Sequence, residues 1–556
     1  MNFKRNLALK LLIVLIATTF MVSCNKTRDY KNSSRATGWA TNAKEGGFQY
    51  NPDAKEQETG PGLVFIEGGT FTKGKVQDDP MHDWNNSPNQ QHVQSFYMDE
   101  TEVTNVMYHE YLDWLKKVFP PSNNEYRKIY EGALPDTLVW RNRLGYSEVM
   151  TNNYLRHPAY ATYPVVGVSW IQAVEFSNWR TDRVNELILE QEGFTTRDAR
   201  YDVSIGTTFN TETYLNSPTQ TYGGNDSITR GGKRSETLLK RNEDSTDIYV
   251  QRKDGLLLPS YRLPTETEWE YAALGLVGLR NYNAYRGRKK YPWDGQYTRS
   301  GKRKTKGDQL ANFKQGDGDY GGIAGWSDDG ADITAKVKSY EPNDYGLYDM
   351  AGNVAEWVAD VYRPIVDDEF NDFNYYRGNV YTKNLIDSDG KIQTVTVDEI
   401  VYDTLSNGKL IARNLPGEII QVPVDDSETY LRTNFSDSDN RDYRDGDKRS
   451  TRYFQSFGDD EELTEGKRMY NSPNHSVDLD NDGKLDRQYD ESSDRTSLVN
   501  NEVRVYKGGS WRDRDYWLDP AQRRYFPQDM ATDFIGFRCA MSRVGDKAKK
   551  GKRPRH

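Results

Sequence analysis

Short apolar runs near the start of the chain predict strands. Leu63 to Ile66 is a continuous apolar run that ends at Gly68-Gly69, and Thr70 to Thr72 has the pattern of its hairpin partner. Phe96 to Met98 is a further run, rich in aromatic residues, which favours another strand. We therefore expect the folded domain to begin with strands close to residue 61.

Helical periodicity follows these strands. Thr104 has the chemistry of a helix N-cap, and Pro120-Pro121 provides a stop. Between them, apolar side chains recur on one helical face, at Tyr108, Tyr111, Leu112 and Leu115. The pattern predicts an amphipathic helix that packs this face against the core.

Capping boxes mark the starts of two further helices. Ser169 with Gln172, and Thr265 with Glu268, have the spacing in which two side chains satisfy each other's backbone N–H groups. The first box predicts a helix from Trp170 to about Arg183. The second lies among several acids, Glu266, Glu268 and Glu270, which we interpret as partners of the helix dipole and not as a catalytic cluster.

Two long polar segments interrupt these patterns. The segment from about 184 to 259 is richer in Thr, Asn and Arg than in apolar residues, and we expect a surface excursion. The segment from about 364 to 501 contains strand-like pieces at Ile392 to Val397 and Ile419 to Val424. It is a candidate for a lobe of its own.

The amino terminus has the pattern of a lipoprotein signal. Basic residues precede a short apolar run, Leu11 to Phe20, and small residues lead to Cys24. We expect residues 1–23 to be removed, Cys24 to be acylated and residues 24–60 to form a linker, ahead of a domain over 61–545 and a basic tail over 546–556. A transmembrane anchor is the alternative, but the apolar run is short for one and leaves Cys24 unexplained.

Composition and charge limit the domain organisation and the kinds of partner that we expect. The 556 residues contain 35% hydrophobic and 12% aromatic residues, and the mean hydropathy is −0.91. These values favour one large, loop-rich domain whose loops are pinned by aromatic rings. A net charge of −10 gives the chain as a whole no cationic footprint for nucleic acid. The only cysteines are Cys24 and Cys539, so acylation of Cys24 would exclude an intramolecular disulfide.

The stretch from Tyr345 to Tyr362 is the strongest candidate for a site. Glycines allow a tight turn, and Asp349 and Glu356 place carboxylates on either side of it. Backbone carbonyls of Gly352 and Val354 would complete a shell of the oxygen ligands that calcium prefers. The alternative is that the two acids cap a short helix and face water.

A second acidic pattern lies in the later insertion. Asp478, Asp480 and Asp482 precede Gly483, and Asp486 follows, in a spacing that wraps oxygens around calcium. The complete loop requires Glu at its twelfth position, where this chain has Tyr489. A weak calcium site and a solvated acidic turn both remain open.

Six motifs in one order carry a family resemblance. They are LVFIEGGTFTKG from Leu63, TYPVVGVSWIQAVEFSNW from Thr162, YRLPTETEWEYAALG from Tyr261, GLYDMAGNVAEW from Gly346, YKGGSW from Tyr506 and IGFRCA from Ile535. From Pro61 to about Val544, the chain closely resembles the formylglycine-generating-enzyme, or sulfatase-modifying-factor, family. The resemblance implies an α+β fold related to C-type lectins, with little regular secondary structure.

The resemblance also implies which chemistry is missing. Oxidase members of the family carry two cysteines after the GGS motif, and these positions hold Asp513 and Leu518. Neither side chain replaces a thiolate as soft metal ligand and nucleophile. The resemblance implies a structural role for Cys539. The six histidines include no pair at helical spacing, so a local two-histidine iron site is absent, although a dispersed site stays open.

Calcium sites are implied by the same resemblance. One set falls on Asp349, Gly352, Val354 and Glu356, where Asp349 stands at a position that the family can also fill with Asn. A second set falls on Asn312, Phe313, Asp329 and Ala331, and the insertion from Gly316 to Gly325 lengthens the connection inside it.

Within the family, the signal and the two insertions most resemble gliding-motility lipoproteins of Bacteroidetes. This resemblance implies a non-enzymatic, calcium-stabilised scaffold of the gliding-motility and type IX protein secretion machinery. We expect it in the periplasm, lipid-anchored to the outer membrane, with other periplasmic and outer-membrane motility or secretion proteins as partners and no nucleic acid. A residual metal-dependent enzyme and a glycan- or peptide-binding module are the rival hypotheses.

Overall fold

The computed structural model describes most of the predicted domain. The described residues are 34, 36–39, 56–75, 86, 88–141, 147–195, 206–224, 249–276, 289–315, 329–362, 382–388, 390–424, 474–477, 486–489 and 502–545. Cys24, the predicted signal 1–23 and the tail 546–556 lie outside them. No helix among the described residues is both long and apolar enough to cross a membrane.

The first sheet joins strands from both ends of the domain. Its order is β1 (Leu63–Ile66), β4 (Phe96–Asp99), β16 (Ala540–Ser542) and β5 (Tyr261–Arg262), with antiparallel neighbours throughout. The strands predicted at Leu63 and Phe96 are therefore confirmed. β16, the last strand of the chain, lies between β4 and β5. This sheet therefore joins the carboxyl end of the domain to its earlier strands.

The predicted hairpin between the first two strands is wrong. β2 (Gly69–Lys73) pairs with β3 (Asn89–Val93), while β1 pairs with β4. The reason lies at Gly68, where an added Cβ would come within 2.4 Å of the Val93 carbonyl oxygen. The chain crosses the β3–β4 connection so closely at this glycine that it leaves the first sheet.

The second sheet contains the central strand of the molecule. Its order is β14 (Arg524–Pro527), β13 (Val503–Lys507), β6 (Ala355–Val361) and β15 (Ile535–Gly536), and only the β6–β15 pair is parallel. All seven residues of β6 are buried. Trp357 packs into one apolar cluster and Val358 into another, so the alternation of side chains along β6 connects two cores.

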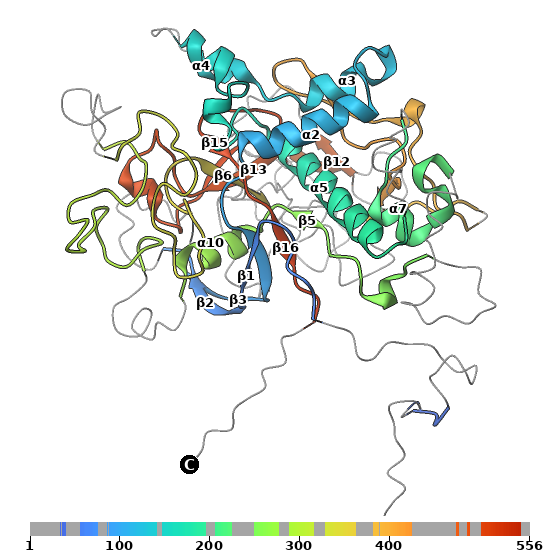
Figure 1. The fold of residues 1–556 in the computed structure, drawn as a ribbon, viewed down its shortest axis with the longest axis horizontal. Helices are drawn as coiled ribbons and strands as arrows, with labels where there is room; N and C mark the ends of the chain where they lie inside the picture. The colour runs from blue at the N-terminus through green and yellow to red at the C-terminus, as the bar shows by residue number, and fades with distance from the viewer. Residues whose placement is uncertain are drawn as a thin grey trace, which may run out of the picture.

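Four helices cover these sheets, and three of them, α2 (Asn105–Val118), α5 (Trp170–Gln191) and α10 (Glu266–Leu274), have the starts that the sequence predicts. α2 follows Thr104, and α3 (Asn124–Ala133) packs against it. Both predicted capping boxes form, at the starts of α5 and α10. Figure 1 shows α2, α3 and α5 grouped above the strands, while α10 lies on the other side with β1, β2 and β3.

The remaining elements are short. The helices are η3 (Thr137–Trp140), α4 (Glu148–Asn153), η4 (Pro158–Tyr160), α7 (Thr211–Asn216), η5 (Pro218–Gly224), η6 (Arg252–Asp254), η8 (Val397–Glu399) and η11 (Asp515–Leu518). The strands are β7 (Thr382–Asn384), β8 (Tyr402–Thr404), β9 (Leu410–Ala412), β10 (Gln421–Pro423), β11 (Asn474–Val477) and β12 (Asp486–Tyr489), paired as β7–β10, β8–β9 and β11–β12. The architecture is thus a mixed α+β fold with little regular secondary structure, as predicted.

The two insertions are more integrated than the sequence predicts. α5 continues to Gln191, past its expected end, and the first insertion packs Phe209, Tyr214 and Tyr222 into an apolar cluster with it. In the second insertion, buried side chains including Val395 and Ala412 join the main core. A separate lobe is therefore the wrong description of residues 382–424, because their apolar side chains are part of the domain core.

The insertions also contact each other. The Thr208 hydroxyl donates to the Pro416 carbonyl at 3.1 Å, and the Thr213 hydroxyl donates to the Gly417 carbonyl at 2.7 Å. An added Cβ on Gly417 would lie 3.3 Å from the Thr208 hydroxyl oxygen. Two segments that are far apart in sequence therefore make one continuous structure alongside α5.

Candidate functional site

The stretch from Tyr345 to Tyr362 forms a tight turn that leads into β6. Asp349 and Asn353 have left-handed backbone conformations, with φ values of +56° and +59°, which are uncommon outside glycine. An added Cβ on Gly352 would lie 2.3 Å from the Asn312 carbonyl oxygen. The turn is confirmed, but Glu356 lies inside strand β6, so the alternative of acids capping a short helix is wrong.

Glu356 is held by an arginine at the centre of the molecule. Its carboxylate accepts hydrogen bonds from Arg538 Nε at 2.7 Å, from Arg538 Nη2 at 2.6 Å and from Trp269 Nε1 at 2.7 Å. Glu356 and Arg538 are 1% and 0% exposed, so the pair is shielded from water. Such a pair is costly to break because either partner alone leaves a buried charge.

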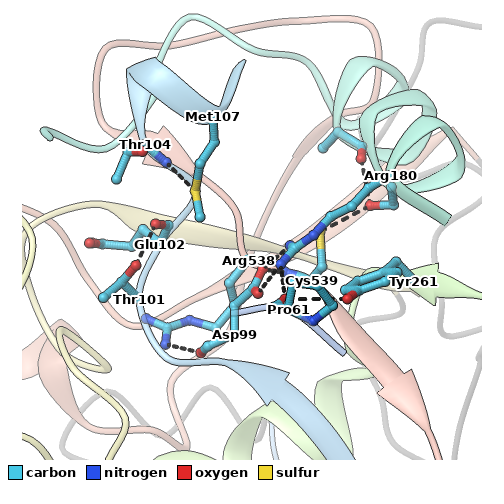
Figure 2. A network of polar contacts seen from close by, with 12 residues as sticks. Pro61, Asp99, Thr101, Glu102, Thr104, Met107, Arg180, Tyr261, Arg538 and Cys539 are labelled. Carbon is cyan, nitrogen blue, oxygen red and sulfur yellow. Dashed lines mark hydrogen bonds and ion pairs between the residues drawn. The ribbon is translucent and has the colours of Figure 1, made fainter. Parts of the chain in front are cut away.

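Arg538 ties this turn to the first sheet. Its Nη1 donates to the Asp99 carbonyl at 3.1 Å, and the Asp99 carboxylate binds Arg180 through two hydrogen bonds of 2.7 and 2.8 Å. Figure 2 shows Asp99 between Arg180 and Arg538, with Cys539 and Tyr261 beside it. Polar contacts thus connect α5, β4 and the segment between β15 and β16 through residues that are far apart in sequence.

Two further carboxylates lie close to Glu356. The Asp349 carboxylate accepts a hydrogen bond from the Lys338 backbone N–H at 3.0 Å, and burial raises its pKa to about 6. Glu102 is completely buried, and Asn353 Nδ2 donates to both its oxygens at 3.1 Å. Burial, followed by the charges of Asp349 and Glu356, raises the pKa of Glu102 well above its usual range.

Sequence reasoning missed Glu102. It directly precedes the helix that starts after Thr104, and nothing in its local spacing distinguishes it from an exposed acid before a helix. Only the folded chain brings it to Asn353 in the turn. The site therefore combines three buried carboxyl groups with one guanidinium, and the raised pKa of Glu102 favours its protonated form.

The side chains of Glu102, Asp349 and Glu356 do not by themselves form a metal site. A cation would neutralise carboxylates whose pKa values are otherwise raised by burial and mutual repulsion. Among the described residues, no three His, Cys, Asp or Glu side chains lie close enough together to hold a metal. A calcium shell here would therefore need backbone carbonyls, as the predicted set with Gly352 and Val354 supplies.

The second predicted calcium set also comes together. The Asp329 carboxylate accepts hydrogen bonds from the Phe313 N–H at 3.1 Å and from the Ala331 N–H at 3.2 Å. The Asn312 carbonyl accepts the Asn353 N–H at 2.8 Å, which joins this set to the turn that carries Asp349. The side chain of Asn312 is directed elsewhere, to the Ile333 carbonyl at 2.7 Å.

Of the third predicted calcium set, only Asp486 is among the described residues. Asp478, Asp480 and Asp482 lie outside the described residues. Asp486 is the first residue of β12, and its backbone pairs with Val477 in β11. The two strands flank the acidic segment, but only their backbone is described.

An ion pair occupies the position of the first family cysteine. Asp513 accepts two hydrogen bonds from Arg524, at 2.5 and 2.6 Å, and one from the Ser510 hydroxyl at 2.6 Å. The guanidinium also lies over Tyr506 and Trp517, with centroid distances of 4.7 and 4.5 Å. Both Asp513 oxygens are therefore already engaged by groups of the protein.

The position of the second cysteine is part of the core. Leu518 is 0% exposed and packs with Tyr291, Phe313 and Ala351. An added Cβ on Gly509, whose φ is +68°, would lie 2.9 Å from the Trp517 carbonyl oxygen. The GGS turn thus packs directly against the segment that holds Leu518.

Cys539 has the character of a structural thiol. It is 0% exposed, burial raises its pKa to about 12, and its sulfur lies 3.4 Å from the Ser177 hydroxyl. A neutral, enclosed thiol is a poor nucleophile and metal ligand.

The acids of α10 are not simple partners of the helix dipole. Glu266 and Glu270 are both 0% exposed, and Lys507 Nζ lies 3.3 and 3.2 Å from their carboxylates. Arg523 lies 2.9 Å from Glu266, and Lys73 lies 3.4 Å from it. Opposite charges lower the pKa of Glu266 against the effect of burial. The sequence interpretation was wrong for these two residues, whereas Glu268 does form the predicted capping box.

Comparison with known proteins decides the family. The sequence profile described as "Sulfatase-modifying factor enzyme 1-like domain" (FGE-sulfatase) matches residues 49–396, which is more than half of the chain. The chain belongs to this formylglycine-generating-enzyme family. Its mixed α+β fold with little regular secondary structure is the fold of the family.

Individual relatives match shorter segments of this family member. It is 39% identical to the formylglycine-generating enzyme of Mus musculus over 99 residues, 18% of this chain and 22% of the relative. It is 37% identical over 108 residues, 19% of this chain and 28% of the relative, to the inactive C-alpha-formylglycine-generating enzyme 2 of the same organism. A match to the serine/threonine-protein kinase pkn1 of Chlamydia pneumoniae has 25% identity over 54% of this chain and 28% of the relative. The chain thus spans less than a third of the length of these curated relatives.

Two solved structures align over most of the chain at low similarity. Variable protein 1 of Treponema denticola aligns with 88% of this chain and 100% of its own, at 16% identity and a TM-score of 0.32. PvdO from Pseudomonas aeruginosa aligns with 86% of this chain and 94% of its own, at 14% identity and a TM-score of 0.36.

Proposed function

We propose that this family member is a non-enzymatic scaffold. The observation that supports this most strongly is the Asp513–Arg524 ion pair at the position of the first family cysteine. A carboxylate that accepts three hydrogen bonds has its lone pairs engaged and is a hard ligand, whereas the family oxidation requires a soft thiolate. The fold is kept while the pair of thiols is replaced by structural contacts.

The finer role in this proposal is in gliding motility and type IX protein secretion. The lipoprotein signal pattern and the two insertions resemble the gliding-motility lipoprotein GldJ, with GldK as a relative that shares the domain. In this role the chain is anchored at Cys24 in the outer membrane and faces the periplasm. Its partners are other periplasmic and outer-membrane proteins of the same machinery, held at high local concentration on one membrane face.

Calcium is the cofactor in this proposal, and its role is structural. Asp349, Glu356 and the carbonyls of Gly352 and Val354 would hold one ion, and Asn312, Phe313, Asp329 and Ala331 a second. Calcium supplies positive charge that neutralises buried carboxylates and cross-links loops. The contact between Asn312 and Asn353 supports coupling of the two sites, because each turn positions the other.

A turnover assay tests the absence of catalysis. The purified full chain is incubated with a cysteine-containing peptide, copper and oxygen, and aldehyde formation is measured by mass spectrometry. The mouse formylglycine-generating enzyme is the positive control. The scaffold proposal expects no aldehyde; aldehyde formed by the parent chain and lost in Asp513→Ala would establish an enzyme.

A binding module is a second candidate, favoured by one hollow on the surface. This hollow is shallow and open to solvent, has a cavity volume of about 20 Å³, and is lined by Trp293, Tyr340, Pro342 and Asp349 among others. The hollow is too small to enclose a sugar or a peptide, so a ligand there would have to lie on the surface against the aromatic rings. Chemical-shift or fluorescence changes at Trp293 on addition of cell-wall glycans distinguish the two, since the scaffold proposal expects none.

A further inference from the structure

A strongly basic loop lies next to the position of the missing second cysteine. This basic loop is the segment from Thr298 to Leu310, with the sequence TRSGKRKTKGDQL. It carries Arg299, Lys302, Arg303, Lys304 and Lys306 against the single acid Asp308, in a chain whose net charge is −10. The concentration of charge is therefore local and opposite to that of the whole molecule.

The basic loop is held in one conformation by its own hydrogen bonds. Arg299 and Gln309 form an antiparallel bridge, and the Leu310 N–H donates to the Thr298 carbonyl at 2.9 Å. The Ser300 N–H donates to the Asp308 carbonyl at 2.8 Å, and the Ser300 hydroxyl lies 2.8 Å from that of Thr305. These bonds fix the tip from Gly301 to Lys306, so the cations are brought together before any partner arrives.

Aromatic side chains lie at the base of the basic loop. Trp293 stacks on Tyr291 with a centroid distance of 5.0 Å, and its Nε1 donates to the Tyr297 carbonyl at 2.8 Å. Tyr291 belongs to the buried cluster that contains Leu518. Tyr297 itself is 79% exposed, which is unusual for so large a ring. Tyr291 thus anchors the base of the basic loop in the core, while the ring of Tyr297 faces solvent beside the cations.

The charges at the tip have few partners within the protein. Lys302 pairs with Glu341, and both side chains are exposed. Arg303, Lys304 and Lys306 are exposed and make no ion pair with any described residue. Repulsion among these ammonium and guanidinium groups opposes their gathering at one tip, and an external anionic surface would relieve it.

We propose that the basic loop binds the phosphate-bearing headgroups of an anionic lipid membrane. Three of the four tip cations are lysines, whose compact charges suit diffuse attraction and lack the fork geometry of arginine. A projecting tip can approach a flat surface, whereas an acidic peptide chain is normally held in a groove. Tyr297 is placed to enter the headgroup region, where amphipathic rings are favoured.

This proposal does not depend on the scaffold role. The loops that contain residues 289–315 and 329–350 occupy the side of the molecule away from α7, drawn in yellow-green in Figure 1. Contact there would orient the domain on the membrane and leave the insertions near α7 available to proteins. A lipid chain and a polybasic patch together bind membranes far more firmly than either alone.

Vesicle sedimentation tests the proposal. The chain from Asn25 to His556, which lacks the predicted signal and the predicted acylation site, is mixed with vesicles of phosphatidylcholine alone or with 30% phosphatidylglycerol added. Binding to the anionic vesicles only, and its loss in 0.5 M NaCl, are expected because exposed charges are screened by salt. At about fivefold per cation, Lys302→Ala, Arg303→Ala and Lys304→Ala together should weaken binding about a hundredfold.

A matched triple variant controls for net charge. Lys116→Ala, Lys117→Ala and Arg127→Ala remove three exposed cations from α2 and α3, and this variant should bind like the parent. Circular dichroism confirms that both variants are folded. Equal binding by the basic-loop variant and the parent would overturn the proposal. So would binding to inorganic phosphate or to soluble polyglutamate with no binding to anionic vesicles.

Discussion

At the scale of single residues, Glu356 has two roles that compete for the same carboxylate group. It is a predicted calcium ligand, and it is also the carboxylate that neutralises the buried Arg538 guanidinium. A calcium ion would have to share this carboxylate with Arg538 and Trp269. Loss of stability on mutating Glu356 is therefore no proof of calcium binding.

Substituting Glu356 tests the ion pair directly. Glu356→Gln leaves Arg538 buried without its counter-charge, and the free energy of unfolding should fall by about 3–5 kcal/mol even with chelator present. Urea denaturation measures the change. Glu148→Gln is the control, because the Arg141–Glu148 pair is exposed and screened by water, so its loss should leave the unfolding curve nearly unchanged. A Glu356→Gln variant as stable as the parent would show that the buried pair is dispensable.

Asp349 gives the cleaner test of calcium. Calcium at a hundredfold excess over Kd should raise the free energy of unfolding by about 2.7 kcal/mol, measured as a shift in melting temperature relative to chelator. Asp349→Asn keeps the Lys338 N–H acceptor but removes one charge, so the shift should become smaller. If calcium does not move the melting temperature of the parent, the proposed sites at Asp349 and Asp329 are wrong.

At the scale of elements, two acids lie at the junction between the second insertion and α5, the half-buried Glu418 and the buried Asp182. Glu418 lies in the second insertion, and burial together with the charge of Asp182 on α5 raises its pKa to about 8. Asp182 in turn accepts the Thr211 N–H at the start of α7, at 2.8 Å. The raised pKa of Glu418 is therefore linked to the position of this insertion beside Asp182.

This junction predicts a dependence of stability on pH. Between its ordinary pKa of 4.5 and about 8, Glu418 keeps a proton in the folded chain that it loses on unfolding. Stability from this group should thus be present at low pH and be lost as pH rises through 8. Melting curves from pH 5 to 9 should fall less steeply for Glu418→Gln than for the parent. The exposed Glu125→Gln is the control, and identical slopes for all three proteins would contradict the account.

The elements that the sequence predicts well are those with local signals. The capping boxes at Ser169 and Thr265 and the stop at Pro120 act through neighbours in the chain, so their helices begin or end as expected. Strand pairing depends on distant partners, and the predicted β1–β2 hairpin failed because Gly68 lets the chain pass close to Val93. The end of α5 was missed because the first insertion supplies its apolar partners only after folding.

At the scale of the whole molecule, the family motifs predicted the turn at Asp349. They also predicted that Asp329 and Ala331 lie beside Asn312 and Phe313, as they do in the structure. They gave no indication of Glu102, or that Glu266 and Glu270 join Lys73, Lys507 and Arg523 in a buried ionic cluster. Such clusters assemble from residues hundreds of positions apart. Composition also predicted loops pinned by aromatic rings, and the stacking of Trp140 on Trp511, 6.1 Å apart, is one such contact.

The replacement of the thiol pair is the central observation at this scale. Asp513 and Leu518 are integrated into the fold through Arg524 and the Tyr291 cluster. If the molecule acts by binding partners, removing the ion pair as a unit should affect stability slightly and function not at all. If the pocket carries out chemistry, the same change should abolish function.

The most direct measurement is protein secretion and gliding by cells whose only copy carries Asp513→Ala and Arg524→Ala together. The double substitution removes both charges and leaves neither unpaired. Protein level and crosslinked partners are measured in the same cells as controls. The account predicts secretion and gliding equal to the parent. Loss of both, with protein level and partners unchanged, would contradict the scaffold role and show that this pocket performs a reaction.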